Sequence, residues 1–342
     1  MNRYDTIKVG FDSGAVQAVN ENVFTWVSGG TQKNESEYYN LVLKKDFKKP
    51  VGLNMLSIDR MGGRGKIELS AKRLEGRYAE SIHKNNIEYL VHKINETGII
   101  KLDTNRFIDS SKMFRFDPCA ILYDFNDTEK YINAINVVSS TNKAYFTRPY
   151  NKGGISYTAK AKTKKTQYRI YPKHPEMLKR KNKAIREFVD PEAFINALRP
   201  EMQVTNFREG RNILGIDEIR DITLKDILDS EKPILYNGFS NVIKWNFGKL
   251  ENDLWSQDSM KFVADMLTSD EKFAKKEKAI AEYFITRFFD NDVQKINSFL
   301  SNEIKGNITT YRKRYTEAIK KKPTENEIEQ VSHFMDQLKR VA

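Results

Sequence analysis

Apolar and polar residues alternate in short runs along the first 80 residues, and Gly, Ser and Asn residues separate these runs. Such alternation predicts β-strands, because successive side chains of a strand point to opposite faces. Strands are expected at Tyr4–Phe11, Val23–Val27, Glu37–Leu43 and Lys66–Ala71. The glycine-rich segment Met61–Gly65 predicts a hairpin turn rather than a phosphate loop, because no Gly-Lys-Ser/Thr sequence follows it.

Helical and strand patterns are mixed in the middle of the chain. Apolar spacing predicts a helix over residues 84–98 that stops at Gly98, and a second helix over Asp127–Ile135 with Asp127 as its cap. Strands are expected at Met113–Asp117, Thr166–Tyr171 and Leu198–Val204, and Gly153–Lys162 would pair with the second of them as a hairpin. Further helices are expected at Pro175–Phe188, at Glu209–Leu214 and after the capping residue Thr223.

The pattern changes near residue 257, where glycine nearly disappears. Helical spacing then recurs at residues 259–267, 270–288, 291–303, 308–320 and 324–340. The sequence therefore predicts an α+β fold: an antiparallel sheet with flanking helices over residues 1–256, and an all-helical C-terminal domain over residues 257–342.

Charge narrows the classes of partner. The chain has 58 Lys and Arg residues against 46 Asp and Glu residues, a net charge of +12. Residues 141–190 alone carry 14 basic and three acidic residues, so this one segment holds most of the excess. A concentrated cationic segment can displace counterions from a phosphate backbone, which favours a nucleic-acid partner.

Other composition features exclude several classes of protein. The single cysteine, Cys119, rules out an intrachain disulfide framework and a thiolate-rich metal cluster. The four histidines show no metal-ligand spacing, and no run of 18 apolar residues predicts a membrane span. The first residues are polar and lack the apolar core of a signal peptide. We therefore expect a cytoplasmic protein with no membrane partner.

Candidate catalytic groups lie at alternate positions of three predicted strands. Arg115 and Asp117 share one face of their strand, as do Arg169 and Tyr171 of the second, and Arg199 and Glu201 of the third. If the strands share a sheet, two carboxylates would hold a divalent cation, a tyrosine would attack phosphorus, and arginines would stabilise the added charge. The alternative is a solvated polar face with ordinary cross-strand ion pairs.

Three segments, in this order and spacing, carry a family resemblance. Lys66–Arg73 holds a Glu-hydrophobic-Ser strand, followed by a helix and by the Arg-hydrophobic-Asp strand Phe114–Asp117. Tyr168–Leu178 holds Arg-x-Tyr-x-Lys-x-x-Glu, and Leu198–Val204 holds Leu-Arg-x-Glu-hydrophobic. Together they resemble the phage and plasmid replication initiators of the filamentous-phage gene II/gene X type and, more loosely, the Rep proteins of small rolling-circle plasmids. The resemblance spans residues 60–230, about half of the chain.

The resemblance implies a rolling-circle initiator that nicks one DNA strand at an origin, in a metal-dependent reaction, and later rejoins it. The enzyme would stay on the 5′ end as a phosphotyrosine and leave a 3′ hydroxyl for the host polymerase. Asp117 and Glu201 would be the ligands of Mg²⁺ or Mn²⁺, and Arg169 and Lys173 would contact phosphate. Expected partners are single-stranded DNA, duplex origin DNA, and the host helicase and polymerase, in the bacterial host cytoplasm.

Two positions depart from the family pattern, and the nucleophile is open. Pro172 stands where the family has Asp, and Pro200 within the Arg-x-Glu strand indicates an edge strand or a bulge. Tyr171 lies on the expected polar face and is the preferred nucleophile. Tyr157, in the preceding hairpin strand, is the rival.

Basic residues near these motifs are expected to hold the DNA backbone. Besides Arg115, they lie at the hairpin tip and in the helix that follows: Lys160, Lys162, Lys164, Lys165, Lys179, Arg180, Lys181 and Lys183. Three aromatic residues between them, Phe146, Tyr157 and Tyr168, would stack on unpaired bases.

Two other functions fit the same sequence. One is a non-catalytic protein that binds an origin or operator on the same fold, with the polar face merely solvated. The other is an RNA-binding protein or nuclease, which would prefer RNA to single-stranded DNA.

Overall fold

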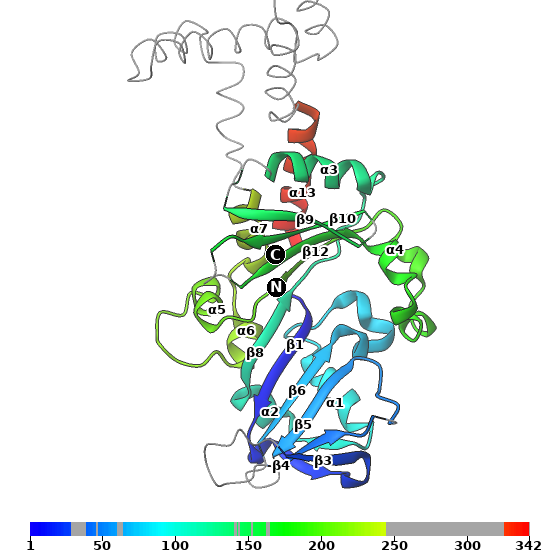
Figure 1. The fold of residues 1–342 in the computed structure, drawn as a ribbon, viewed down its shortest axis with the longest axis vertical. Coiled ribbons are helices and arrows are strands. Elements are labelled where there is room, and N and C mark those ends of the chain that lie inside the picture. Colours follow the sequence, from blue (N-terminus) through cyan, green and yellow to red (C-terminus); the bar gives the residue numbers. More distant parts are fainter. Residues whose placement is uncertain are drawn as a thin grey trace, which may run out of the picture. The chain divides into compact units, whose positions relative to one another are not determined.

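The computed structural model describes residues 1–28, 39–45, 47–59, 64–139, 142, 144–151, 153–161, 165–243 and 325–341 (Figure 1). The chain divides into two compact units. The first comprises Met1–Ile132, Ala144–Val242 and Met335–Ala342, and the second comprises Asn133–Lys143 and Ile243–Phe334. Both large sheets and the candidate site belong to the first unit. The domain boundary expected at residues 256 and 257 lies outside the described residues, as do four of the five expected C-terminal helices.

An antiparallel six-stranded sheet forms one part of the first unit, with the strand order β3-β4-β5-β6-β1-β8 (Figure 1). Its strands are β1 (Tyr4–Phe11), β3 (Phe24–Ser28), β4 (Tyr39–Leu43), β5 (Leu53–Asp59), β6 (Gly65–Ser70) and β8 (Lys112–Pro118). Strands β5 and β6 pair as antiparallel neighbours, and the amide of Asp59 donates to the carbonyl of Arg64 at 2.7 Å. Residues 60–63 of the expected turn lie outside the described residues.

An antiparallel four-stranded sheet forms the other part, with the order β12-β11-β10-β9. Its strands are β9 (Tyr145–Tyr150), β10 (Gly154–Ala159), β11 (Gln167–Pro172) and β12 (Leu198–Gln203). Two short strands, β2 (Val16–Val19) and β7 (Ile100–Leu102), form a separate pair. The sequence therefore predicted the α+β class with antiparallel sheets correctly, although it did not predict β2, β5, β7 or β9.

The two large sheets meet at their edges, where β8 and the segment that follows it run beside β12. Isolated bridges link Phe116 to Val204, Cys119 to Glu201, and Leu122 to Leu198. As Pro200 indicated, β12 is the end strand of its sheet, and the carbonyl of Pro200 accepts from the amide of Ala120 at 3.2 Å. This edge-to-edge join brings the three strands with candidate catalytic groups next to one another.

Helices flank the sheets. The α-helices are α1 (Ile87–Asn95), α2 (Thr104–Ser110), α3 (Thr128–Ser139), α4 (Lys173–Met177), α5 (Phe207–Leu214), α6 (Leu224–Asp229), α7 (Ile234–Ile243) and α13 (Glu325–Val341). The 3₁₀ segments are η1 (Ser13–Ala15), η2 (Glu21–Val23), η3 (Ala71–Glu80), η4 (Arg180–Asn182), η5 (Ile185–Glu187) and η6 (Pro191–Phe194). None of the helices in the described part of the chain is long and apolar enough to cross a membrane.

Local signals set several helix ends. The Thr223 hydroxyl and the Asp226 carboxylate form a capping box at the start of α6. The carboxylate of Asp127 accepts from the amide of Lys130 at 3.0 Å at the start of α3, as expected. Gly215 ends α5 in the left-handed conformation, with φ of 70°.

The helix expected at Pro175–Phe188 does not form as one element. Instead α4 spans five residues, and the turns η4 and η5 follow it. The side chain of Asn182 points inward and donates to both the backbone carbonyl and the carboxylate of Glu176, at 2.7 and 2.8 Å. Such side-chain bonds to the backbone compete with helical pairing, which explains why the basic residues there lie on turns.

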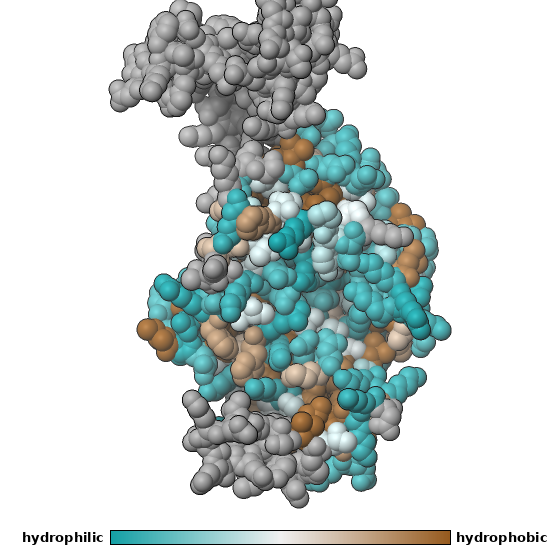
Figure 2. All heavy atoms as spheres, in the orientation of Figure 1, coloured by the Kyte–Doolittle hydropathy of each residue, from teal (hydrophilic) through white to brown (hydrophobic). Residues whose placement is uncertain are grey.

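The apolar faces of both sheets are buried. Ile7, Val9, Ile67 and Leu69 in the six-stranded sheet are fully buried. In the four-stranded sheet, Tyr168 packs against Phe239 of α7, with ring centroids 5.6 Å apart. The opposite faces carry polar residues, and in the view of Figure 2 hydrophilic side chains cover most of the described surface, with hydrophobic ones in small groups.

Gly52→Ala should lower the free energy of unfolding by about 1–3 kcal/mol. Gly52 has φ of +81°, and an added Cβ would lie 2.3 Å from the backbone nitrogen of Arg73, at the start of η3. Thermal unfolding followed by circular dichroism measures the effect. Gly76→Ala is the matched control, because nothing lies within 4 Å of its Cβ position and its φ is not positive. Equal melting temperatures for the two variants would contradict this account of the turn.

Candidate active site

Strand register places the candidate groups on one continuous polar face. In the four-stranded sheet, Tyr171 lies opposite Arg199, and Arg169 lies opposite Glu201. Across the join, Glu201 lies opposite Cys119, two residues beyond Asp117. Residues directly opposite each other, and residues two apart on a strand, share a face. The predicted side-by-side arrangement of the three strands is therefore present, and their polar groups converge.

Asp117 lies on this face with no exposed surface. The Nε of Arg115 donates to its Oδ1 at 2.8 Å, and the Nη2 of Arg115 donates to its Oδ2. Arg115 also lies 3.7 Å from the carboxylate of Glu68. Burial raises the pKa of Asp117 to about 7, although the Arg115 guanidinium opposes this shift. Asp117 is thus a carboxyl group that exchanges a proton near neutral pH.

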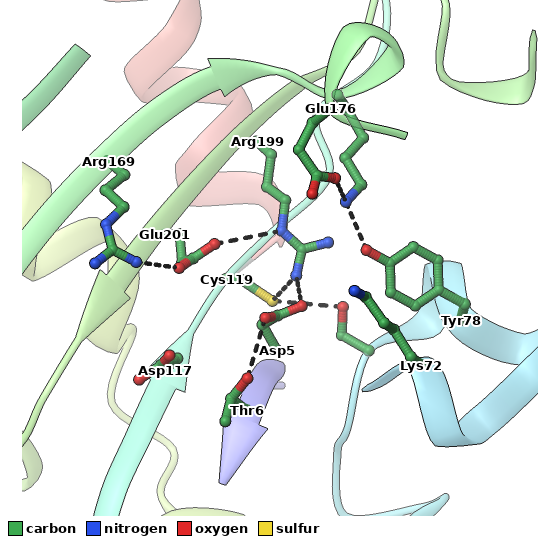
Figure 3. Close-up of polar contacts among 12 residues, drawn as sticks. Asp5, Thr6, Lys72, Tyr78, Asp117, Cys119, Arg169, Glu176, Arg199 and Glu201 are labelled. Atoms are coloured by element: carbon green, nitrogen blue, oxygen red, sulfur yellow. Dashed lines mark hydrogen bonds and ion pairs between the residues drawn. The ribbon is translucent and has the colours of Figure 1, made fainter. Parts of the chain in front are cut away.

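Glu201 is the carboxylate at the centre of the face, and it is 5% exposed. Arg169 donates to its Oε1 at 3.0 Å, and the Tyr171 hydroxyl donates to its Oε2 at 2.9 Å. The Nε of Arg199 lies 3.8 Å from the same Oε2 atom. One carboxylate therefore joins a phenol and two guanidinium groups. Figure 3 shows the two guanidinium groups, those of Arg169 and Arg199.

Tyr171 lies within this cluster and is 5% exposed. Burial raises the pKa of its phenol well above the usual value, the negative charge of Glu201 adds to the rise, and Arg199 opposes it. The phenol therefore holds its proton at neutral pH, and Glu201 is positioned to accept it. The ring of Tyr150 lies 5.4 Å from that of Tyr171, on the side of β9.

Arg199 is wholly buried between the two sheets, as Figure 3 shows. Its Nη2 atom donates to Asp5 of β1 and to the Sγ of Cys119, the latter at 3.3 Å. Its Nε and Nη1 atoms have no hydrogen-bond partner among the described residues. The charge of this buried guanidinium is met by Asp5 on one side and by Glu201 on the other.

Lys173 does not lie where a phosphate contact would require it. It is 1% exposed, and its Nζ donates to Glu176 at 2.7 Å and to the Tyr78 hydroxyl at 2.5 Å. Burial lowers the pKa of its ammonium, and Arg199 adds to this effect, while Glu176 and Asp5 oppose it. The chain turns into α4 at Lys173, so the side chain enters the interior and stabilises the fold around the site.

Tyr157, the rival nucleophile, faces the other way. It lies opposite Tyr168 in the pairing of β10 with β11, is 1% exposed, and shares the apolar face that α7 covers. Tyr168 is also buried, at 7% exposure. Neither ring is accessible for base stacking, whereas Phe146 is 50% exposed.

The basic residues expected to hold DNA have different environments. Lys162 and Lys164 lie outside the described residues. Arg180, Lys181 and Lys183 are exposed on the turn after α4, and Lys179 is half-buried there. Lys165 is exposed, and its backbone amide donates to Glu209 at 2.8 Å. Lys160 is exposed, with its ammonium 5.0 Å from the ring centroid of Phe146.

Each carboxyl group of the network has a cationic partner without a metal ion. The carboxyl groups of Asp5, Glu68, Asp117, Glu176 and Glu201 face the cationic groups of Lys72, Arg115, Arg169, Lys173, Lys181 and Arg199. Across the described residues, no three His, Cys, Asp or Glu side chains are grouped as ligands of one ion. Asp117 and Glu201 supply oxygen atoms of the right type, but their close partners are guanidinium groups. The donor set therefore does not fit a divalent cation in the free protein.

Several members of the site were missed at the level of sequence. Asp5 lies in an alternating strand that also carries the polar residues Thr6 and Lys8, so no signal in the pattern marks it as the partner of a buried arginine. Tyr78 and Lys72 lie in η3, where no strand or helix periodicity marks them. Tyr150 lies in β9, a strand that the pattern did not predict.

A search of protein-family models found no match to this chain, and a search of curated proteins found no similar sequence.

Glu176→Gln should remove a source of acid sensitivity. Burial raises the pKa of Glu176, but Lys173 and Asn182 outweigh burial and hold it at about 2, below the usual 4.5. A lowered carboxyl pKa gives stability that is present above about pH 4.5 and is lost as pH falls toward 2. The loss would be about 3 kcal/mol.

Urea unfolding between pH 5 and pH 2 measures this contribution of Glu176 to the free energy of unfolding. The unfolding free energy of the wild type should fall more steeply with pH than that of Glu176→Gln. Glu192→Gln is the control, because Glu192 is 62% exposed and pairs only with His174 at the surface. If the unfolding free energies of the wild type and Glu176→Gln changed with pH in parallel, the network would not lower the pKa of Glu176.

Proposed function

We propose that this protein nicks and rejoins one strand of DNA through a covalent phosphotyrosine at Tyr171, as a rolling-circle replication initiator would. The observation that carries the proposal is the 2.9 Å hydrogen bond from the Tyr171 hydroxyl to Glu201 Oε2, with Arg169 and Arg199 on either side of that carboxylate. Covalent catalysis is expected to use a nucleophile that is hydrogen-bonded to a base, with the base held by a third group. Here these are Tyr171, Glu201 and Arg169. The family resemblance and the basic segment at residues 141–190 add support.

Proton and bond changes balance along this route. Glu201 accepts the phenol proton as the oxygen of Tyr171 bonds to phosphorus, and the bond from phosphorus to the 3′ oxygen breaks. The departing oxygen takes up a proton, for which Asp117 is the nearby acid because its pKa is about 7. The products are a 5′-phosphotyrosine and a 3′ hydroxyl. Rejoining reverses each step, with Glu201 returning the proton to Tyr171.

Arginines supply the stabilisation of charge in this proposal. Arg169 is 18% exposed at its side chain and lies at the solvent side of Glu201, where it would meet the phosphate first. Arg199 has no exposed surface and its Nε faces Glu201, so it would act through that carboxylate by holding it in place beside the phosphate. The resemblance adds a divalent cation, Mg²⁺ or Mn²⁺. Because each carboxyl group of the cluster already has a cationic partner, no step here is routed through a cation.

A second function fits one specific observation. Every carboxylate of the network has a cationic partner, and Tyr171 is 5% exposed, as in a structural network that only holds two sheets together. On that view the protein binds an origin or operator without cutting it. The polar face would then contact DNA but perform no chemistry.

Supercoiled plasmid DNA carrying the protein's own origin separates these functions. The wild type should give relaxed circles and a protein–DNA adduct that survives denaturing gels, in buffer with Mg²⁺, with Mn²⁺ and with EDTA in parallel. Tyr171→Phe should abolish the adduct because it lacks the attacking oxygen. Tyr157→Phe should retain the adduct, since Tyr157 lies on the opposite face.

Three outcomes would oppose the proposal. An adduct that persists in Tyr171→Phe and disappears in Tyr150→Phe would move the nucleophile to Tyr150. DNA binding by the wild type without relaxation or adduct, in any of the three buffers, would favour the non-catalytic function. Tighter binding to single-stranded RNA than to DNA of the same sequence, again without an adduct, would favour an RNA-binding protein.

Glu201→Gln should slow adduct formation by about 10²–10⁴-fold, because the amide cannot accept the phenol proton. Single-turnover kinetics on a single-stranded oligonucleotide measure this rate. Glu218→Gln is the matched control, because its side chain is 78% exposed and pairs with Arg220 in the segment between α5 and α6, outside the cluster. A rate within about threefold of the wild type in Glu201→Gln would exclude Glu201 as the base.

A further inference from the structure

Two exposed phenylalanines lie on the polar face, one on each side of the cluster that holds Tyr171. Phe146 of β9 is 50% exposed and Phe114 of β8 is 37% exposed. Across the joined sheets the strand order is β1-β8 and then β12-β11-β10-β9, so the strands that carry Glu201 and Tyr171 lie between the strands that carry these two rings. Phe114 also packs edge-on against Phe207 of α5, with ring centroids 6.1 Å apart. A single exposed aromatic needs no explanation, but two beside one site do.

Phe114 reaches this face because of a β-bulge. In the pairing of β1 with β8, Lys8 lies opposite Arg115 and Val9 lies opposite Met113, so Phe114 is the extra residue. Bulges re-aim side chains, and this one turns Phe114 away from the buried face on which strict alternation would place it with Phe116. The ring lies over Gly10, where a Cβ would be 2.6 Å from its Cε2 atom.

Each ring carries a lysine ammonium near its face. Lys66 Nζ lies 5.0 Å from the ring centroid of Phe114, and Lys160 Nζ lies 5.0 Å from that of Phe146. Both lysines are exposed. Each pair thus combines a flat apolar surface with a positive charge, which are the two features that a nucleotide's base and phosphate require.

Polar side chains without large apolar groups connect Phe146 to the site. Register places Phe146 opposite Thr158, Thr158 opposite Gln167, and Gln167 opposite Gln203 of β12. With strands about 4.8 Å apart, this row covers about 14 Å from β9 to β12. Hydroxyl and amide groups along it can hydrogen-bond to sugars and base edges.

We propose that Phe146 with Lys160 and Phe114 with Lys66 are two stacking positions for unpaired bases, and that the strand between them crosses the cluster with its phosphate over Tyr171 and Glu201. This rests on the proposed function, for which a single strand is the expected substrate, and it assigns the two positions on this face that would hold its bases. The base faces of a duplex are already covered by neighbouring bases. The occupant is thus a single DNA strand held at both sides of the phosphate that reacts.

Equilibrium binding of the full chain to a fluorescent oligo(dT) of about 20 nucleotides tests the proposal by fluorescence anisotropy, in EDTA. Phe146→Ala and Phe114→Ala should each weaken binding by about 5- to 100-fold, since stacking on one base is worth that much. Binding of a blunt duplex of the same length should change by less than about twofold. Phe188→Ala is the matched control, a phenylalanine outside both sheets with 46% exposure.

Conservative variants separate stacking from simple loss of apolar surface. Phe146→Trp should retain tight binding and Phe146→Leu should not, because leucine keeps the apolar area without a flat ring. Lys160→Gln and Lys66→Gln should each lower the slope of log Kd against log salt by about 0.7, the value for one phosphate contact on a single strand.

The outcomes are distinct. Wild-type affinity in both Phe146→Ala and Phe114→Ala overturns the stacking positions, even if the wild type forms the Tyr171 adduct. Equal losses on single strands and on duplex also overturn them, since duplex bases cannot stack there. A selective loss on single strands supports them, and it does so independently of nicking, because binding in EDTA does not require Tyr171 to react.

Discussion

A buried ion pair between the two sheets is the interaction on which the rest of the structure depends. Arg199 of β12 has no exposed surface, and it bonds to Asp5 of β1 while facing Glu201 of its own strand. A guanidinium removed from water costs several kcal/mol unless its charge is met. The two sheets therefore have to keep the relative position in which Asp5 and Glu201 meet Arg199. That same position makes one polar face out of two sheets.

The network gives the candidate nucleophile an unusual setting. Tyr171 is held against a carboxylate in a site where burial disfavours the phenolate, so it is unreactive until negative charge can pass to a bound phosphate. Glu201, Arg169 and Arg199 are held by other side chains rather than by water, so they need little rearrangement when charge develops. Buried pairs of this kind contribute less to stability than to geometry. A reacting site requires such fixed positions of its charged groups.

Period-two alternation identified the chemistry-bearing strands and the residues that share a face within each. It placed Asp117, Tyr171 and Glu201 on polar faces, and the structure brings those faces together. Alternation does not predict where a β-bulge or the start of a helix interrupts a strand. The bulge at Phe114 moves that ring to the polar face, and the start of α4 turns Lys173 inward. Alternation also does not show which face of a sheet is covered by other elements. The pattern therefore leaves Tyr157 as a candidate, whereas α7 covers its face in the structure.

The identity of the reacting tyrosine is the central claim, and mass spectrometry of the trapped adduct tests it most directly. After nuclease and trypsin digestion, the account predicts nucleotide mass on the peptide of residues 170–173, which contains Tyr171 as its one tyrosine. Nucleotide mass on a peptide that contains Tyr150 or Tyr157, with none on residues 170–173, would contradict it.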